Sequence, residues 1–295
     1  MKNTRKPHMI KSPLNYTGGK YKLLPQILPL FPNNINTFVD LFAGGCSVGV
    51  NAQSQKTIFN DNLTYLIDFY KTIQAFDEKE TLKYIYKRIN EFELSKTNQE
   101  GFNLLRNEYN KSKKPLDFFV LVAYSFNHQI RFNNKHHFNC SFGKNRSHFN
   151  SNMKKNLCEF LEAIKKIDCT FLHLSFEKFN FSSLTEEDFI YCDPPYLITT
   201  ANYNDGKRGF KGWTETEEKQ LLALLDNLHQ KNIKFALSNV IEHENKKNQI
   251  LEDWIENTKY NRYDLSFDYR NSSYQKKYRG VTKEILITNY NPRSL

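Results

Sequence analysis

The sequence predicts an α/β fold, and three observations support this prediction. A buried apolar strand at residues 37–42 runs into a glycine-rich turn, which is how doubly wound folds begin a βαβ unit. Residues 62–167 then carry helical stripes with little strand character. From residue 168 onward, short apolar runs again alternate with amphipathic segments, as in a sheet covered by helices. Together these patterns describe a Rossmann-like sheet with a mostly helical insertion.

The N-terminal elements surround two glycine turns. Residues 15–20 (NYTGGK) form a turn in which an aromatic ring and a lysine flank the glycines, and residues 21–31 carry apolar side chains at helical spacing. Residues 43–49 (AGGCSVG) are predicted to turn from the first strand into a helix. Residues 57–61 form a second short strand that ends in an acid.

The ends of these two strands predict a nucleoside site. Bare glycine backbone and a helix N-terminus let a ligand approach closely, and a carboxylate at Asp61 can accept both hydroxyls of a ribose. The spacing is not G-x-G-x-x-G, and the carboxylate of Asp40 would oppose a pyrophosphate. S-Adenosylmethionine, a ribose nucleoside joined to a charged amino acid, therefore fits better than a dinucleotide. A glycine turn after a strand is by itself weak evidence for any nucleotide.

The insertion, residues 62–167, contains helical stripes and one polar loop. The stripes at residues 66–73 and 82–92 are interpreted as core packing, and residues 116–126 form an almost wholly apolar helix. The loop at residues 127–148 interleaves aromatic rings with cations and amides, which suits a hairpin that reads base edges in a DNA groove. A solvated surface loop is the alternative. Its adjacent histidines have no carboxylate or cysteine at ligand spacing, so no metal site is expected.

The second half of the chain resumes the alternation of strands and helices. Thr214 and Glu217 form a capping box in front of an amphipathic helix that runs through Leu228, and a further helix is expected at residues 244–257. The strands are expected at residues 169–174, 189–192 and 233–238, with a terminal β pair at residues 263–269 and 281–290.

The strand at residues 189–192 leads directly into Asp193-Pro194-Pro195-Tyr196. Two prolines fix φ and supply no N–H, so the Asp193 carboxylate and the Pro194 carbonyl become a rigid pair of hydrogen-bond acceptors. An exocyclic amino group has two N–H donors that match this pair, and the Tyr196 ring offers a face on which the base can stack. The tetrapeptide therefore indicates a clamp for the amine of a nucleobase. An ordinary turn is the alternative.

Composition and charge favour a nucleic-acid partner. The 42 Lys and Arg residues outnumber the 32 Asp and Glu residues and give a formal net charge of +10. A soluble basic protein that binds no nucleic acid can have the same net charge, and this is the alternative. The basic, glycine-containing loop at residues 199–213 is interpreted as a mobile lid on a DNA backbone, with plain disorder as the alternative, and the basic linker at 270–279 as a further phosphate contact. Five cysteines without close pairing predict neither disulfides nor zinc, and hence a reducing cytosol. No signal peptide or membrane span is expected.

These signals, in this order, resemble the Dam-type DNA adenine N6-methyltransferases of the D12 class. Residues 15–20 look like that family's W-A-G-G-K element, residues 38–48 (FVDLFAGGCSV) are similar to its methyl-donor motif, and residues 193–196 (DPPY) match its catalytic motif. A donor motif first, a recognition insertion in the middle and D-P-P-Y last is the α-group arrangement of amino-methyltransferases. The resemblance covers nearly the whole chain.

The resemblance implies a fold, a reaction and a setting. Residues 1–61 and 168–295 would form a discontinuous S-adenosylmethionine-dependent catalytic domain, and residues 62–167 a DNA target-recognition domain made of a helical bundle and a basic hairpin. The reaction would move a methyl group to the N6 amine of a flipped-out adenine in a short specific double-stranded DNA sequence, leaving S-adenosylhomocysteine and needing no metal. The setting would be the bacterial cytoplasm, in a restriction-modification system beside a separate endonuclease or as an orphan methylase, with a monomer in solution.

The resemblance, together with the composition of the polar loop, also identifies the expected site residues. The catalytic residues are Asp193, Pro194, Pro195 and Tyr196. The donor-binding residues are Tyr16, Lys20, Asp40, Phe42, Ala43, Gly44, Gly45, Asp61, Ser175, Phe176 and Asp193. The DNA-contacting residues are Asn15, Asn127, Gln129, Arg131, Asn133, Ser141, Lys144 and Arg146. Within the donor site, Lys20 would lie near the donor's carboxylate, Asp61 would hold the ribose and Phe176 would stack on the adenine.

Three positions depart from relatives that read GATC. Those relatives have a lysine where this chain has Asn15, and apolar hairpin residues where it has Gln129 and Ser141. Such positions help to choose bases, so GATC is not predicted as the target, while the chemistry is unaffected.

Three other functions share parts of this pattern. A cytosine N4-methyltransferase performs the same reaction on another amine, but its motif more often begins with serine where this chain has Asp193. A nicotinamide dehydrogenase shares the strand and turn but does not account for D-P-P-Y or the positive charge. A non-catalytic DNA-binding module with an idle donor site is the alternative outside enzymes.

Overall fold

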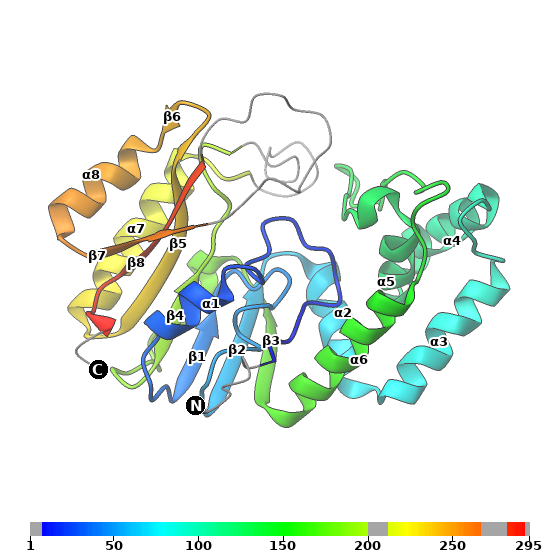
Figure 1. Cartoon of the computed structure of the whole chain (residues 1–295), viewed down its shortest axis with the longest axis horizontal. Helices are drawn as coiled ribbons and strands as arrows, with labels where there is room; N and C mark the ends of the chain where they lie inside the picture. Colours follow the sequence, from blue (N-terminus) through cyan, green and yellow to red (C-terminus); the bar gives the residue numbers. More distant parts are fainter. Residues whose placement is uncertain (1–7, 200–211, 267–281, 293–295) are drawn as a thin grey trace, which may run out of the picture.

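The computed structural model describes residues 8–199, 212–266 and 282–292. These residues form one mixed sheet, covered by helices on both faces, with a group of inserted helices beside its β3 edge (Figure 1). The predicted basic loops at 199–213 and 270–279 lie outside the described residues, except for residues 199, 212 and 213. Among the described residues, no helix combines the length and apolarity needed to cross a bilayer.

The strands are β1 (Thr37–Asp40), β2 (Lys56–Asp61), β3 (Asp168–His173), β4 (Phe189–Cys192), β5 (Lys234–His243), β6 (Lys246–Lys247), β7 (Asn261–Leu265) and β8 (Thr282–Thr288). They run in the order β3-β2-β1-β4-β5-β8-β7, with β6 paired to β5. The first five strands in this order are parallel, and β8 is antiparallel to both β5 and β7. The predicted Rossmann-like α/β class is confirmed, as is the terminal β pair.

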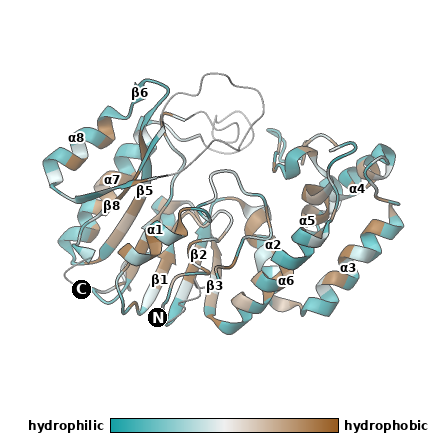
Figure 2. Cartoon of the chain, viewed as in Figure 1, coloured by the Kyte–Doolittle hydropathy of each residue, from teal (hydrophilic) through white to brown (hydrophobic). Residues whose placement is uncertain are grey.

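Alternate residues of the central strands enter two different cores. Val39 and Ile190 pack on the face covered by α7 (Glu215–Gln230) and α8 (Gln249–Thr258). Phe38 and Phe189 point to the opposite face, where α1 (Leu24–Ile27) lies. Because successive side chains of a strand point to opposite faces, both faces can be buried only if the strand is apolar throughout. The central strands are accordingly brown in the hydropathy colouring of Figure 2.

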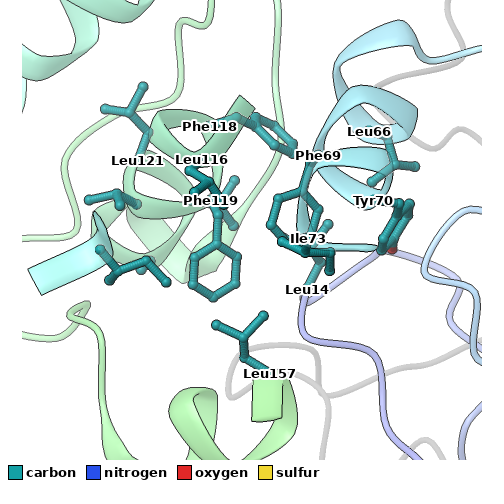
Figure 3. Close-up of a cluster of buried hydrophobic side chains, with 14 of the residues drawn as sticks. Leu14, Leu66, Phe69, Tyr70, Ile73, Leu116, Phe118, Phe119, Leu121 and Leu157 are labelled. Carbon is teal, nitrogen blue, oxygen red and sulfur yellow. The ribbon is translucent and has the colours of Figure 1, made fainter. Parts of the chain in front are cut away.

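The insertion between β2 and β3 is built around one fully buried helix. Its helices are α2 (Thr64–Ala75), α3 (Glu78–Glu91), α4 (Gln99–Ser112), α5 (Pro115–Tyr124) and α6 (Ser151–Lys166). Every residue of α5 from Leu116 to Tyr124 is buried. In Figure 3, Phe119 of α5 lies between α2 and Leu157 of α6, and its ring stacks on Phe69 at 5.3 Å and 2°. This core continues into Phe59 of β2, so the insertion is packed onto the sheet.

The segment 43–49 corrects the sequence prediction, because it forms successive turns and no helix. Gly44 and Cys46 have φ of 47° and 57°, in the left-handed region that interrupts a helix. The turns are held by side chains instead: the Gly49 amide donates to Asp40 at 3.1 Å, and the Gly44 amide donates to Asp61 at 2.9 Å. The strand-end acids therefore take the place of a helix N-terminus in shaping this turn.

Other predicted elements exist with different boundaries. The helix expected at 21–31 is reduced to α1 and a 3-10 turn (Leu28–Leu30), because each begins at or near a proline that cannot continue the preceding helix. The helix expected at 244–257 begins at Gln249, since Glu244 and Asn245 have positive φ in a turn and Asn248 caps the helix. The helix at 116–126 ends at Tyr124, and the strand at 233–238 continues to His243. The capping box of Thr214 and Glu217 is confirmed.

Candidate active site

The candidate site lies where the strand order reverses, between β1 and β4. Asp40 ends β1, Asp61 ends β2 and Asp193 directly follows β4, so three carboxylates meet at the carboxyl edge of the sheet. All three line a cavity of about 460 Å³. In open α/β sheets, ligands bind at this edge and at such a reversal, because the chain leaves neighbouring strands in opposite directions and opens a crevice.

All residues predicted to be catalytic or to bind the methyl donor line this one cavity. They are Tyr16, Lys20, Asp40, Phe42, Ala43, Gly44, Gly45, Asp61, Ser175, Phe176, Asp193, Pro194, Pro195 and Tyr196. Of the residues predicted to contact DNA, Asn15 and Arg131 line it. The others, Asn127, Gln129, Asn133, Ser141, Lys144 and Arg146, are not among the lining residues.

The glycine turn at 43–46 lies so close to neighbouring side chains that it has no space for a side chain of its own. A Cβ on Gly44 would lie 2.7 Å from the Tyr16 ring, and a Cβ on Gly45 would lie 3.0 Å from Ser12 Oγ. The turn is also tied to the insertion, because the Tyr70 hydroxyl of α2 donates to the Gly44 carbonyl at 3.0 Å. A ligand can thus meet bare backbone that is held rigidly from behind.

Asp61 is the predicted ribose acceptor, and backbone amides already hold it. Its Oδ2 accepts from Gly44 N at 2.9 Å and its Oδ1 accepts from Leu63 N at 2.9 Å. Each carboxylate oxygen can accept a second hydrogen bond, so the orientation is fixed while capacity for two hydroxyls remains. Burial raises the pKa of Asp61, and the amides of Leu63 and Gly44 act in the opposite direction.

Asp193 stands at the centre of a buried charge network. Lys20 Nζ lies 2.7 Å from Asp193 Oδ2, and the Tyr196 hydroxyl donates to Asp193 Oδ1 at 2.9 Å. Burial alone would lower the pKa of Lys20, but the carboxylates of Asp193 and Glu284 outweigh it and raise that pKa, so Lys20 is a cation here. Lys20 Nζ also lies over one face of the Tyr196 ring, 5.1 Å from its centroid.

Asp40 is a buried carboxyl of the cavity with a raised pKa. Burial raises its pKa to about 8, with further contributions from the charges of Asp193 and Asp61, although the hydrogen bond from the Gly49 amide lowers it. A positive charge placed in the cavity would favour the ionised form. Asp40 therefore suits a cationic ligand.

One end of the cavity is aromatic. Trp213 packs edge-on to Phe42 at 5.6 Å and also contacts Phe176 at 5.6 Å. The indole Nε1 donates to Glu218 at 2.7 Å, and the other oxygen of Glu218 accepts from the Asn239 and Asn248 amides. Rings held at fixed angles around an open space provide faces on which a purine can stack.

Three residues of the site were missed by the sequence analysis. Glu284 is buried on β8 and contacts both Lys20 and Tyr196, Trp213 lines the aromatic end, and Asn60 ties the Leu41 and Leu174 carbonyls together. A signal existed for Asn60, a polar residue in a strand whose neighbours are buried, whereas Glu284 only precedes the apolar run of β8 and follows two polar residues. Trp213 directly precedes the capping box.

Three of the predicted DNA-contacting residues are linked by hydrogen bonds. Asn15 Nδ2 donates to the Asn127 carbonyl at 3.1 Å, and Arg146 donates to Asn127 Oδ1 at 3.0 Å. The Asn133 side chain instead accepts from two amides within its own turn. Gln129, Ser141 and Lys144 are exposed nearby in the chain.

Arg131 lies inside the hairpin, where Phe132 and Phe138 form an isolated β bridge. Its Nε donates to Asn139 Oδ1 at 3.0 Å, and its guanidinium also donates to the Asn139 carbonyl at 2.7 Å. These bonds point the side chain along the hairpin. Since Arg131 also lines the cavity, it connects the hairpin with the cavity.

No group of three or more His, Cys, Asp or Glu side chains that could hold a metal occurs within residues 8–199, 212–266 and 282–292.

Comparison with known proteins identifies a family. The family model described as D12 class N6 adenine-specific DNA methyltransferase matches residues 16–267, most of the chain. This match contains the glycine turns, the insertion and residues 193–196.

Two similar proteins are named as modification enzymes. The Type II methyltransferase M.FokI of Planomicrobium okeanokoites is 50% identical over 281 residues, and the modification methylase StsI of Streptococcus sanguinis is 51% identical over 285 residues. These matches cover 95% and 97% of this chain but 43% and 44% of the relatives. The chain thus spans less than half of their length. The DNA adenine methylase of Salmonella typhi is 27% identical over 231 residues, 77% of this chain and 79% of that protein.

Proposed function

The chain belongs to the family of D12 class N6 adenine-specific DNA methyltransferases, and from this membership we propose that it methylates the N6 amine of adenine in a short, specific double-stranded DNA sequence. The methyl donor is S-adenosylmethionine, and the product is S-adenosylhomocysteine. The observation that carries the proposal is that Asp193-Pro194-Pro195-Tyr196 shares one cavity with Tyr16, Lys20 and Asp61. An amine clamp and a nucleoside site in a single cavity suit group transfer between two nucleosides.

The residues of the cavity fit the proposed donor. The turn at Gly44 and Gly45 has no space for a side chain and supports close approach of a ligand, and Asp61 retains acceptor capacity for a ribose. Phe42, Phe176 and Trp213 offer ring faces to an adenine. Buried carboxylates, with Asp40 among them, favour the positive charges of a sulfonium and an ammonium group. When bound, the donor supplies an electrophilic methyl group.

The clamp residues prepare the amine. The adenine N6 lone pair is conjugated with the ring and hardly nucleophilic. Asp193 and the Pro194 carbonyl accept its two N–H groups and so direct the lone pair out of the ring plane, while the Tyr196 ring stacks on the base. Lys20, 2.7 Å from Asp193, keeps that carboxylate in place. The contribution of these residues is orientation and electrostatics, with no covalent intermediate on the protein.

The insertion is proposed to recognise the DNA. Residues 62–167 form the target-recognition domain, and residues 1–61 with 168–295 form the catalytic domain. The net charge of +10 favours a phosphate backbone, and the hairpin carries amides and cations that can pair with base edges. The target adenine leaves the duplex to reach the cavity, at a cost of a few kcal/mol that stacking and phosphate contacts offset.

The biological setting is proposed from the relatives' names. Two of them are named as modification enzymes, which favours the modification half of a restriction-modification system with a separate endonuclease as partner. An orphan methylase, like the proteins named DNA adenine methylase, is equally allowed. The proposed location is the bacterial cytoplasm and the proposed state in solution is a monomer.

The test is transfer of labelled methyl from S-adenosylmethionine to DNA, with the modified nucleoside identified by mass spectrometry. We expect N6-methyladenine from the wild-type protein, at a fixed sequence. Asp193→Ala should abolish transfer, because the amine loses its charged acceptor, and should leave DNA binding largely intact. The matched control is Asp264→Ala, an exposed carboxylate on β7 that should not alter the rate. N4-methylcytosine as the product, or a near wild-type rate in Asp193→Ala, would contradict the proposal.

A further inference from the structure

The starting point is that the proposed acceptor, Asp193, is already in use. Its Oδ2 is paired with Lys20 at 2.7 Å and its Oδ1 accepts from the Tyr196 hydroxyl at 2.9 Å. A target amine that binds to Asp193 must therefore compete with two donors of the protein itself, one of them charged. Charge-assisted hydrogen bonds are about twice as strong as neutral ones, so this competition is substantial.

A second carboxylate lies within reach of the same two donors. Glu284 is 4% exposed and sits on β8, two strands from Asp193, where it pairs with Val240 of β5. Its Oε1 accepts from the Tyr196 hydroxyl at 3.0 Å and lies 3.4 Å from Lys20 Nζ. The Tyr196 hydroxyl and the Lys20 ammonium are thus both shared between Asp193 and Glu284.

The number of protons decides what this sharing can do. A tyrosine hydroxyl has one proton and donates to one acceptor at a time, so its bond to Asp193 and its bond to Glu284 are alternatives. The Lys20 ammonium has three protons and already donates one to the Gly18 carbonyl at 2.8 Å. A small rotation of the hydroxyl proton moves the tyrosine bond wholly to Glu284, without displacing a heavy atom.

We propose that Glu284 is a positioning residue for methyl transfer, the acceptor that takes over Tyr196 and Lys20 so that Asp193 is released to the target amine. The proposal rests on the function proposed above. No bond to carbon and no net proton transfer is involved, because only the directions of existing hydrogen bonds change. Glu284 acts through Asp193 and does not itself touch the substrate.

A buried glutamate costs folding free energy unless it is paired, and Lys20 and Tyr196 are two partners that Glu284 shares with Asp193. One lysine serves two carboxylates, Asp193 and Glu284, where one would neutralise it. Asp193 alone can serve as the counterion of Lys20. Its carboxylate lies 2.7 Å from Lys20 Nζ, closer than the carboxylate of Glu284 at 3.4 Å. Glu284 therefore offers Lys20 and Tyr196 a second acceptor when Asp193 binds another partner.

The first experiment compares wild type with Glu284→Gln. The glutamine keeps the shape and an acceptor oxygen but loses the charge, so Tyr196 and Lys20 should stay with Asp193. We expect kcat for methyl transfer to fall roughly 10- to 100-fold, the effect of one charge-assisted hydrogen bond, while KM for the donor changes less than about threefold. The matched control is Glu242→Gln on the neighbouring strand, which pairs with Lys283 at 2.7 Å and should keep the wild-type rate.

The second experiment separates this role from that of a structural counterion. Tyr196→Phe keeps the ring but removes the competing donor from Asp193. In the Tyr196→Phe background, Glu284→Gln should lower kcat clearly less than it does in the wild-type protein. The kcat losses of the two single variants are then not additive. A counterion role through Lys20 alone predicts the same loss in both backgrounds. If Glu284→Gln fails to fold, the same cycle is run with Glu284→Asp, which keeps the charge but withdraws the acceptor by one methylene.

The outcomes are distinct. A wild-type protein without methyl transfer to DNA would overturn the proposed function and this proposal together. With an active wild type, a rate within twofold in Glu284→Gln, or full additivity with Tyr196→Phe, would overturn the role of Glu284 and leave the proposed function intact. A kcat loss that is relieved by Tyr196→Phe supports it.

Discussion

At the residue scale, the site gathers ionisable side chains out of water. Lys20, Asp40, Asp61 and Glu284 are all buried, and one cation stands among several carboxylates. Burial disfavours the charged form of each group, so this arrangement is costly for folding unless a ligand brings positive charge. A surplus of buried carboxylates is what a cationic methyl donor would need.

Asp40 gives a prediction about stability and pH. In the folded protein its pKa is about 8, raised by burial from an ordinary value of 3.8. Between these two pH values the folded state binds more protons than the unfolded state, so the contribution of Asp40 to stability falls as pH rises. Asp40→Asn should therefore become progressively more stable than wild type from about pH 4 to pH 8, by up to about 1.4 kcal/mol per pH unit.

The measurement is urea unfolding at several pH values, without donor. The exposed Asp264→Asn is the matched control, and its difference from wild type should not grow with pH. A constant difference between Asp40→Asn and wild type across that range would show that Asp40 is ionised in the folded protein.

At the element scale, the start of α7 belongs to the cavity as much as to the helix. Thr214 caps the helix, and Trp213, the residue before it, lines the aromatic end of the cavity. The carboxylate of Glu218, 1% exposed, fixes the indole from within the first turn of the same helix. A local capping motif thereby sets the position of a ring that is far from the other ring residues in the sequence.

Trp213 can report donor binding directly. The chain has two tryptophans, and Trp254 bonds Asp226 in contact between α8 and α7, away from the cavity. Trp254→Phe leaves Trp213 as the tryptophan emitter, and its fluorescence should change when S-adenosylhomocysteine is added. Trp213→Phe should show no such change, and Trp213→Ala should weaken binding about 10-fold through lost ring contact. A saturable signal in Trp213→Phe would place the adenine elsewhere.

At the scale of the whole molecule, three parts of the chain meet at the cavity mouth. The N-terminal turn contributes Asn15, the insertion contributes Arg131, and the sheet contributes the strand ends. The bond from Asn15 to Asn127 joins the first two parts directly. The shared core of the insertion and β2 holds them in one arrangement, so packing would couple the proposed recognition surface to the proposed catalytic residues.

Arg131 and Arg106 form a matched pair for testing recognition. Both donate to hairpin carbonyls, Arg131 to Asn139 and Arg106 to Cys140, but only Arg131 of the two lines the cavity. Arg131→Ala should relax or weaken site choice by about 1–3 kcal/mol, the value of one base-edge contact. Arg106→Ala should loosen the hairpin without changing which sequence is methylated. Methylation mapping by sequencing checks both, and an unchanged pattern in Arg131→Ala would move base reading elsewhere in the hairpin.

Much of the fold and the site could be predicted from contiguous sequence. The strands at 37–42, 57–61 and 189–192 are apolar runs with turn residues after them, and strand-end acids in parallel strands must meet at one edge. The prediction of a helix at 43–49 was wrong. The turns there have left-handed backbone at Gly44 and Cys46 and donate to the carboxylates of Asp61 and Asp40, and the spacing of apolar residues carries no information on such contacts. The roles of the individual residues in donor and DNA binding stay predictions.

The sequence by itself determined the α/β class, the family and the three acids at the strand ends, because each is written in a short stretch of chain. Only the tertiary structure decided which side chains share Asp193. Lys20 comes from the N-terminal turn and contacts Asp193 directly. Glu284 comes from the last strand and meets the same Lys20, because β4 lies inside the sheet and β8 folds back beside β5. Hydrogen-bond partners follow from strand order and burial, and no local pattern encodes them.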